Sequence, residues 1–419
     1  MNALTRQVRR AAGLGRNAKL FLVMTAVSGL GNGIFMLFLN LFVLSRGNDE
    51  AFLGLLMSLM SLSALVLGLP MGVLADRMGR KRALLLGGLL STTASLVAIL
   101  SPIDWPLAAA MVALGAGNAL YMATGPAFMA ENATEEERST LFSLQSGLSM
   151  LVAFAGSALG GPLPAAFAGL LRVPPESATA YRATLLAAEG VMTLSFIPLL
   201  AVRERGRGPA AGEERPSLSL RAIPMGGAMV RLLVPQLIIG LGAGLLIPYL
   251  NVFFKRRFAI SDSLLGLTFA VSQLLMGLAT LAAPMLAERW GKIRTVVVTE
   301  LASLPFLMVL GFVPVLPVAI GGFWLRAMLM NMGGPLYTAF AMEQVPEGER
   351  GRAGAMLGLA WSIGQGVGPG ISGLVQRSVG FTPLFLTTGT TYLTAALLVQ
   401  AFFRRAEKPA VEPGALPAE

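Results

Sequence analysis

Twelve apolar stretches dominate this sequence and limit what it can fold into. Each is about 20 residues long, the length that a helix needs to cross a hydrocarbon core of about 30 Å. They cover residues 20–44, 51–75, 83–101, 105–130, 139–162, 181–202, 228–254, 261–287, 293–313, 315–342, 353–375 and 381–403. Inside a bilayer every backbone N–H and C=O must be bonded within the chain, so each stretch is predicted to be helical. The sequence therefore predicts an all-α membrane protein with twelve transmembrane helices.

The composition supports a membrane protein and excludes several other classes. Hydrophobic residues make up 55% of the chain and charged residues only 13%, far from the averages of soluble domains. The net charge is +10, but the basic residues lie in loops between apolar stretches, so we expect no nucleic-acid partner. The chain has no Cys and no His, which leaves carboxylates as the only side chains that carry protons near neutral pH. We expect no catalytic residues, no metal and no cofactor, and hence no enzyme.

The distribution of Lys and Arg gives the expected orientation. With the N-terminus inside the cell, the cytoplasmic segments hold 24 of the 32 Lys and Arg residues, the outer segments hold 7, and Arg326 lies within a span. Short cytoplasmic loops carry such an excess. We therefore expect a multi-pass protein of the cell inner membrane with both termini in the cytoplasm. The basic cluster Lys255-Arg256-Arg257 on the predicted outer side is the main exception.

The sequence repeats itself at an offset of 211 to 212 residues. Residues 29–42 match residues 240–253 at 7 of 14 positions, and residues 74–79 resemble residues 286–291. Such repeats predict two six-helix bundles of common design. We expect an N-terminal bundle (1–202), a cytoplasmic linker (203–221), a C-terminal bundle (222–405) and a cytoplasmic tail (406–419).

One polar loop between spans carries a recognisable motif. Pro70 and Gly72 are expected to end the preceding helix, and Gly79 permits a turn before three consecutive basic residues. The segment 72–82, GVLADRMGRKR, resembles the signature between helices 2 and 3 of the major facilitator superfamily of secondary transporters. This resemblance implies two pseudo-symmetric six-helix bundles and transport by alternating access.

The resemblance also implies a gating role for the loop. In the family this loop acts as a latch, a role that carries over to Gly72, Asp76, Arg77, Gly79 and Arg80. The second copy supplies Glu288, Arg289 and Gly291, with Pro284 where the first copy has Gly72. An acid at a helix end can pair with a cation in one arrangement of the bundles and not in another. The alternative is that Asp76 only caps its own loop.

Polar residues in four spans are predicted to face a central cavity. On span 20–44 they recur at spacings of 3 or 4, which places them on one helix face, and the repeat offset gives matching stripes on 105–130, 228–254 and 315–342. The family resemblance implies that these four helices line the cavity. The predicted substrate-binding residues are Asn32, Met36, Asn40, Asn118, Tyr121, Gln236, Tyr249, Asn251, Arg326, Met330 and Tyr337. Interhelical hydrogen bonds within a bundle are the alternative explanation for each.

The signals for coupling and direction are less direct. The run 364–369, GQGVGP, resembles the glycine-proline pattern of superfamily antiporters, which suggests export, although close helix packing also explains it. No carboxylate lies on the predicted cavity stripes. Glu189 and Glu300 lie within spans, where burial of a charge is costly, so they are candidates for proton coupling or for pairing between helices. Arg326 near the membrane midplane needs a partner, either an anionic substrate group or Glu300.

These observations predict a secondary active transporter that exports a small organic solute through the inner membrane. The alternatives within transport are a proton-coupled uptake symporter and an uncoupled facilitator. A membrane receptor or scaffold without transport activity is the alternative from a different class. The expected partners are the solute, the lipid bilayer and protons as a coupling ion, and the chain is expected to be a monomer.

Overall fold

The computed structural model describes residues 13–203 and 227–404. Most of the predicted linker 203–221 and the predicted tail 406–419 lie outside these ranges. The described residues form helices and connecting turns and contain no β-strand. The main helices are α2 (Arg16–Ser45), α3 (Glu50–Met78), α4 (Arg80–Leu100), α5 (Trp105–Glu131), α6 (Glu135–Gly160), α8 (Ala178–Leu194), α10 (Gly227–Leu246), α12 (Asp262–Trp290), α13 (Lys292–Phe312), α14 (Leu316–Glu343), α15 (Arg350–Val379) and α16 (Thr382–Phe403).

All twelve predicted spans have a helical counterpart, which confirms the fold class. Within the described ranges, ten helical segments are long and apolar enough to cross a membrane. The other two long helices are α14, which contains Arg326, and α15, which is rich in glycine. The arginine in α14 and the glycines in α15 lower the mean hydropathy of these helices but do not end them, because neighbouring helices can pack against the backbone and accommodate the charge.

Several helix boundaries differ from the prediction. The expected end of a helix at Pro70 and Gly72 is wrong, because α3 continues through both residues to Met78. The span 228–254 is divided into α10, a short 3-10 segment η2 (Ile247–Tyr249) and α11 (Leu250–Phe258). Pro248 lies in this break and has no N–H to donate to a helical ladder. Likewise, α7 (Leu163–Leu171) follows α6 after Pro162, and α9 (Phe196–Leu200) follows α8.

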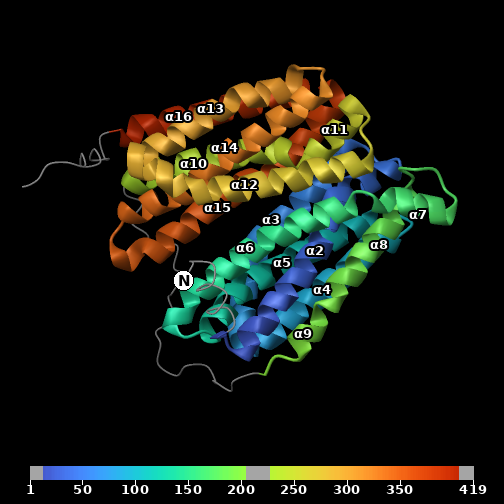
Figure 1. Cartoon of the computed structure of the whole chain (residues 1–419), viewed down its shortest axis with the longest axis horizontal. Coiled ribbons are helices and arrows are strands. Elements are labelled where there is room, and N and C mark those ends of the chain that lie inside the picture. Colours follow the sequence, from blue (N-terminus) through green and yellow to red (C-terminus); the bar gives the residue numbers. More distant parts are fainter. Residues whose placement is uncertain (1–12, 204–226, 405–419) are drawn as a thin grey trace, which may run out of the picture. The chain divides into compact units, whose positions relative to one another are not determined.

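The chain divides into two compact units. Among the described residues, unit 1 contains 13–203 together with 247–274 and 369–378, and unit 2 contains the others. In unit 1, α2 packs against α6 and α8, and α5 packs against α3 and α4. In unit 2, α13 packs against α14 and α16, and α10 packs against α16. These pairings, visible within each unit in Figure 1, correspond under the repeat offset: α2 with α8 becomes α10 with α16, and α4 with α5 becomes α13 with α14.

Glycine allows the same close helix contact in both repeats. A Cβ atom on Gly33 of α2 would lie 3.2 Å from the Cα of Gly156 on α6. A Cβ atom on Gly368 of α15 would lie 2.7 Å from the Cα of Gly244 on α10. Gly33 and Gly156 are related to Gly244 and Gly368 by offsets of 211 and 212. Close packing between helices therefore accounts for these glycines of α6 and α15.

Candidate functional site

A single glycine connects the two helices that carry the motif. Gly79 lies between Met78, the last residue of α3, and Arg80, the first of α4, and its φ is +88°. Gly291 connects α12 to α13 in the same way, with φ at +87°. Residues with a Cβ rarely adopt this conformation. The one-residue turn is thus shared by both sequence repeats of this chain.

Arg80 connects three helix ends at this turn. Its Nη1 lies 2.6 Å from Asp76 Oδ1 on α3, and its Nε donates to Glu131 Oε1 at the end of α5 over 2.9 Å. In the second repeat, Lys292 forms an ion pair with Glu343 at the end of α14. Glu131 and Glu343 stand at the same repeat offset as Arg80 and Lys292, so each basic residue reaches the equivalent helix end. The repeat pattern contains this signal, although the predicted gating residues included neither glutamate.

The remaining motif residues are less constrained. Gly72 lies on the part of α3 that faces α5, where an added Cβ would lie 3.9 Å from that of Ala123. Arg77, Glu288 and Arg289 are exposed, and the ion pairs of the described residues include none of them. The second copy therefore retains the pair between helices but lacks the link from Glu288 to Lys292 that would correspond to Asp76 and Arg80.

Asn40 and Asn251, which are related by the repeat, bond to each other. Asn40 Nδ2 donates to Asn251 Oδ1 at 3.2 Å and to the carbonyl of Pro248 at 2.5 Å. Asn251 Nδ2 donates to the carbonyl of Leu37 at 2.8 Å. Each asparagine is only 4% exposed. The two amides therefore join α2 to α11 within unit 1, and in this structure neither amide is free to face a cavity.

The other predicted cavity residues differ in exposure. Asn32, Met36 and Asn118 are exposed, Tyr121, Gln236 and Met330 are partly buried, and Tyr249, Tyr337 and Arg326 are buried. The two buried tyrosines bond to backbone carbonyls of other segments. Tyr249 donates to Pro369 and Tyr337 donates to Leu232, each over 2.7 Å. In this structure both hydroxyls serve packing between segments, whereas the amides of Asn32 on α2 and Asn118 on α5 are exposed.

Arg326 and Glu300 are buried in the same helix packing of unit 2. Arg326 is 3% exposed, and its Nη2 lies 3.3 Å from the hydroxyl of Tyr392 on α16, whose ring lies under the guanidinium. Glu300 is 5% exposed, and its carboxylate lies beside Gly333 on α14. No ion pair joins these two charges, and Arg326 Nε and Glu300 Oε2 have no hydrogen-bond partner among the described residues. Glu189 on α8 is also buried, at 1% exposure.

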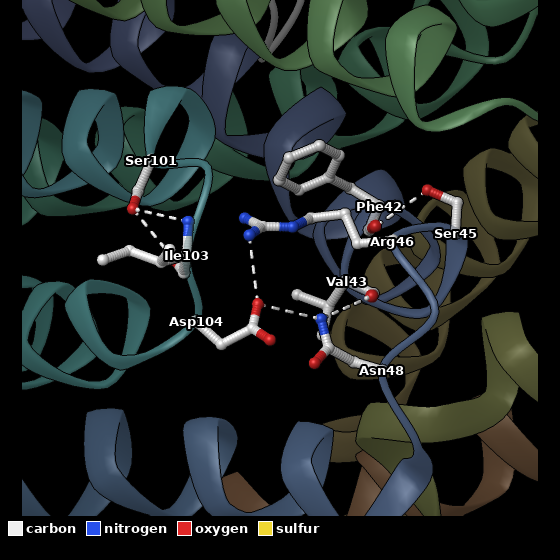
Figure 2. Close-up of polar contacts among 8 residues, drawn as sticks. All are labelled: Phe42, Val43, Ser45, Arg46, Asn48, Ser101, Ile103 and Asp104. Carbon is white, nitrogen blue, oxygen red and sulfur yellow. Dashed lines mark hydrogen bonds and ion pairs between the residues drawn. The ribbon is translucent and has the colours of Figure 1, made fainter.

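Hydrogen bonds join the C-terminal end of α2 to the start of α5. Figure 2 shows the carboxylate of Asp104 between Arg46 and Asn48, with distances of 3.0 Å to Arg46 Nη2 and 3.3 Å to Asn48 Nδ2. The guanidinium of Arg46 also lies 5.7 Å from the ring centre of Phe42. Asp104 was not among the predicted site residues. Its contacts fix the loop between α2 and α3, which lies on the predicted outer side.

Comparison with protein families gives a match over nearly the whole chain. The model described as Major Facilitator Superfamily matches residues 21–234 and 232–418. A curated relative, the tetracycline resistance protein of class E from Escherichia coli, is 25% identical over 304 residues, covering 69% of this chain and 71% of that protein.

Solved transporters share the fold at low sequence identity. The nucleoside transporter NupG has a TM-score of 0.74 at 13% identity, and the match covers 94% of this chain and 99% of that one. An inward-facing, occupied bacterial homologue of the human lysosomal transporter Spinster has a TM-score of 0.74 at 15% identity, covering 92% and 96%. A D-xylose-proton symporter has a TM-score of 0.70 at 17% identity, covering 91% and 97%.

Proposed function

Because this chain belongs to the major facilitator superfamily of transporters, we propose that it exports a small organic solute by alternating access. The direction is supported by the similarity to the tetracycline resistance protein of class E, whose name describes protection against a drug. The glycine-proline run 364–369 agrees with export, although close packing also accounts for its glycines. The solved transporters are similar in fold alone and favour no direction.

The exposed polar residues of α2 and α5 are the proposed solute contacts. Asn32 and Asn118 carry amides that are free to donate and accept hydrogen bonds. Met36 lies one helical turn from Asn32, and its flexible thioether suits solutes of varied shape. The buried residues Asn40 and Asn251 would reach the solute only in a state in which their mutual contact is broken.

Arg80 and its partners are the proposed latch. The contacts of Arg80 with Asp76 and Glu131 join α3, α4 and α5 at the turn that contains Gly79. The distances between Arg80 and its two partners are expected to change during the transport cycle. The ion pairs therefore favour the helix arrangement in which these distances are short. Exposed ion pairs contribute little by themselves, so the latch is proposed to bias the balance between two states and not to hold the fold together.

Protons are the proposed coupling ion, with Glu189 and Glu300 as buried carboxylates that are candidates to carry them. We further propose that the protein acts as a monomer in the inner membrane with both termini in the cytoplasm. Its bundles would cover residues 1–202 and 222–405, joined by the linker 203–221.

Transport in proteoliposomes tests this function. Vesicles containing the purified full chain are loaded with a panel of labelled amphipathic solutes and assayed with and without a proton gradient. We expect export of at least one solute and a faster rate with the gradient. Asn32→Ala and Asn118→Ala should weaken apparent affinity, whereas Thr390→Ala, an exposed polar residue of α16 outside the predicted stripes, should not. Movement of solutes only in the uptake direction would overturn the proposal of export.

A further inference from the structure

The basic cluster on the predicted outer side is largely neutralised by two acids at repeat-related positions. Lys255 Nζ on α11 lies 2.8 Å from Asp262 Oδ1, and Arg256 pairs with Glu50. Glu50 is the first residue of α3 and Asp262 is the first residue of α12, and they are 212 residues apart. Each acid is only 6% exposed. One cationic segment of the second repeat therefore binds the beginnings of two equivalent helices, all within unit 1.

Lys255 uses all three of its N–H donors in this arrangement. Besides Asp262, its ammonium lies 2.5 Å from Glu176 Oε1 and 3.0 Å from the carbonyl oxygen of Ile260. Asp262 in turn accepts a hydrogen bond from the hydroxyl of Tyr181 on α8 at 3.2 Å. An ammonium with three partners in fixed directions is fully satisfied. The contact therefore joins α11, α12, α8 and the loop before α8 through one side chain.

Protons can reach this group from water. The side chain of Glu176 is 53% exposed, whereas those of Lys255 and Asp262 are 9% and 6% exposed. Glu176, Tyr181, Lys255 and Arg256 also line a cavity of about 230 Å³. The charged and titratable groups around Asp262 are Lys255, Glu176 and Tyr181, with the Arg256–Glu50 pair alongside. Protonation of Asp262 would remove the partner that is buried with Lys255 and leave the ammonium with only the more exposed Glu176.

We propose that Lys255, Asp262, Glu176 and Tyr181 form a proton-operated clasp that holds α11, α12 and α8 together at this end of the helices and releases them when Asp262 is protonated. The clasp holds the beginning of α12, and the neighbouring Arg256–Glu50 pair holds the beginning of α3, whose other end contains Asp76 of the proposed latch. A helix is rigid along its axis, so freeing its beginning allows it to tilt at its other end. This inference rests on the proposed alternating access. It gives protons a role although no carboxylate lies on the predicted stripes of the central cavity.

Labelling of a single introduced cysteine tests the clasp in the full chain. The natural chain has no Cys, so Met36→Cys on the α2 stripe provides one reporter for a membrane-impermeant maleimide added on the Lys255 side of vesicles. In this background Lys255→Gln should raise the labelling rate roughly tenfold, because loss of a contact that is made in only one of two states shifts the equilibrium toward the other. The matched control is Arg257→Gln, which removes an exposed neighbouring charge that has no ion pair among the described residues, and it should label like the parent.

The dependence on pH provides a second readout. The parent should label faster as the outer pH is lowered, because protonation of Asp262 removes the carboxylate that pairs with Lys255, whereas Asp262→Asn should label fast at every pH. Lys255→Arg keeps the positive charge, so its labelling rate should stay close to that of the parent. This variant separates loss of the clasp from loss of folding. Parent-like labelling of well-folded Lys255→Gln, or an unchanged pH response in Asp262→Asn, would overturn the clasp. If the natural chain moves no solute in proteoliposomes while the Met36→Cys chain keeps the labelling response, the proposed export would be contradicted and the clasp would not.

Discussion

Arg80 donates to Glu131 across 2.9 Å, and the residues 212 positions later, Lys292 and Glu343, form the equivalent ion pair. Both pairs join the start of one helix to the end of the helix packed against it, α4 with α5 and α13 with α14. The first copy adds Asp76, whereas Glu288 at the equivalent place in the second has no ion pair among the described residues. The two copies thus carry the same charges but pair them differently, which predicts unequal roles.

Removing the charge of Arg80 should therefore affect transport more than removing that of Lys292. We expect Arg80→Gln to lower the transport rate several-fold with little change in thermal stability, since exposed pairs contribute about 1 kcal/mol or less. Arg77→Gln is the matched control, because Arg77 is exposed and has no ion pair in the described part of the chain. The effect is measured as the initial transport rate in proteoliposomes of Arg80→Gln, of Lys292→Gln and of the control. Equal rates for Arg80→Gln and Arg77→Gln would show that the junction is only a local tie.

The turn at Gly79 should not tolerate a side chain. Its φ of +88° combined with ψ of 152° is unfavourable for an L-residue by roughly 1 to 3 kcal/mol, so Gly79→Ala should lower the melting temperature in detergent. Gly68→Ala is a suitable control, because Gly68 lies within α3 and an added Cβ would meet nothing within 4 Å. That control should be neutral or slightly stabilising. A melting temperature of Gly79→Ala at or above that of the control would contradict the argument from the backbone.

The close helix contacts predict a paired pattern of glycine substitutions. Gly156→Ala would place a Cβ 2.6 Å from the carbonyl oxygen of Leu30, and Gly368→Ala would place one 2.6 Å from the carbonyl carbon of Gly244. Both clashes involve backbone atoms and require the helices to separate, so both variants should be destabilised by about 1 to 3 kcal/mol.

Gly147→Ala and Gly358→Ala are the controls on the same two helices, α6 and α15. Neither added Cβ would meet an atom within 4 Å, and both variants should melt close to the parent. Thermal unfolding followed by circular dichroism measures all four. If only one of the two close-contact variants were destabilised, the repeats would differ in packing despite their matching glycines.

The buried charges of unit 2 predict a rescue. Arg326→Gln removes the positive charge that is buried in the same helix packing as Glu300, and if the two charges stabilise each other without direct contact we expect lower stability and less folded protein in the membrane. The double variant Arg326→Gln with Glu300→Gln should recover much of that loss, because no charge remains in the packing of α13, α14 and α16. Glu189→Gln combined with Arg326→Gln is the control and should give no rescue, since Glu189 belongs to unit 1. Failure of the first double variant to recover stability would favour Arg326 as a solute contact.

The sequence alone determined the class of fold because the bilayer imposes a simple rule on length and hydropathy. The twelve apolar stretches and the excess of Lys and Arg in alternate loops depend on local composition, and the offset of 212 depends on comparison of the sequence with itself. These signals were sufficient to predict the helices, though not all of their boundaries, and the repeat. The motif at residues 72–82 could be located because its glycines, Asp76 and basic residues resemble the family signature, and Gly79 does lie at a turn with positive φ.

Only the tertiary structure decided which polar groups are paired, because pairing depends on distances between segments far apart in the chain. Asn32 and Asn40 share a predicted stripe, yet Asn32 is exposed and Asn40 is bonded to Asn251. Lys255 was an exception to the charge distribution and Asp262 was not among the predicted site residues, yet packing places the two 2.8 Å apart. A helical period fixes the face on which a side chain lies, but what that face meets is determined by the fold as a whole.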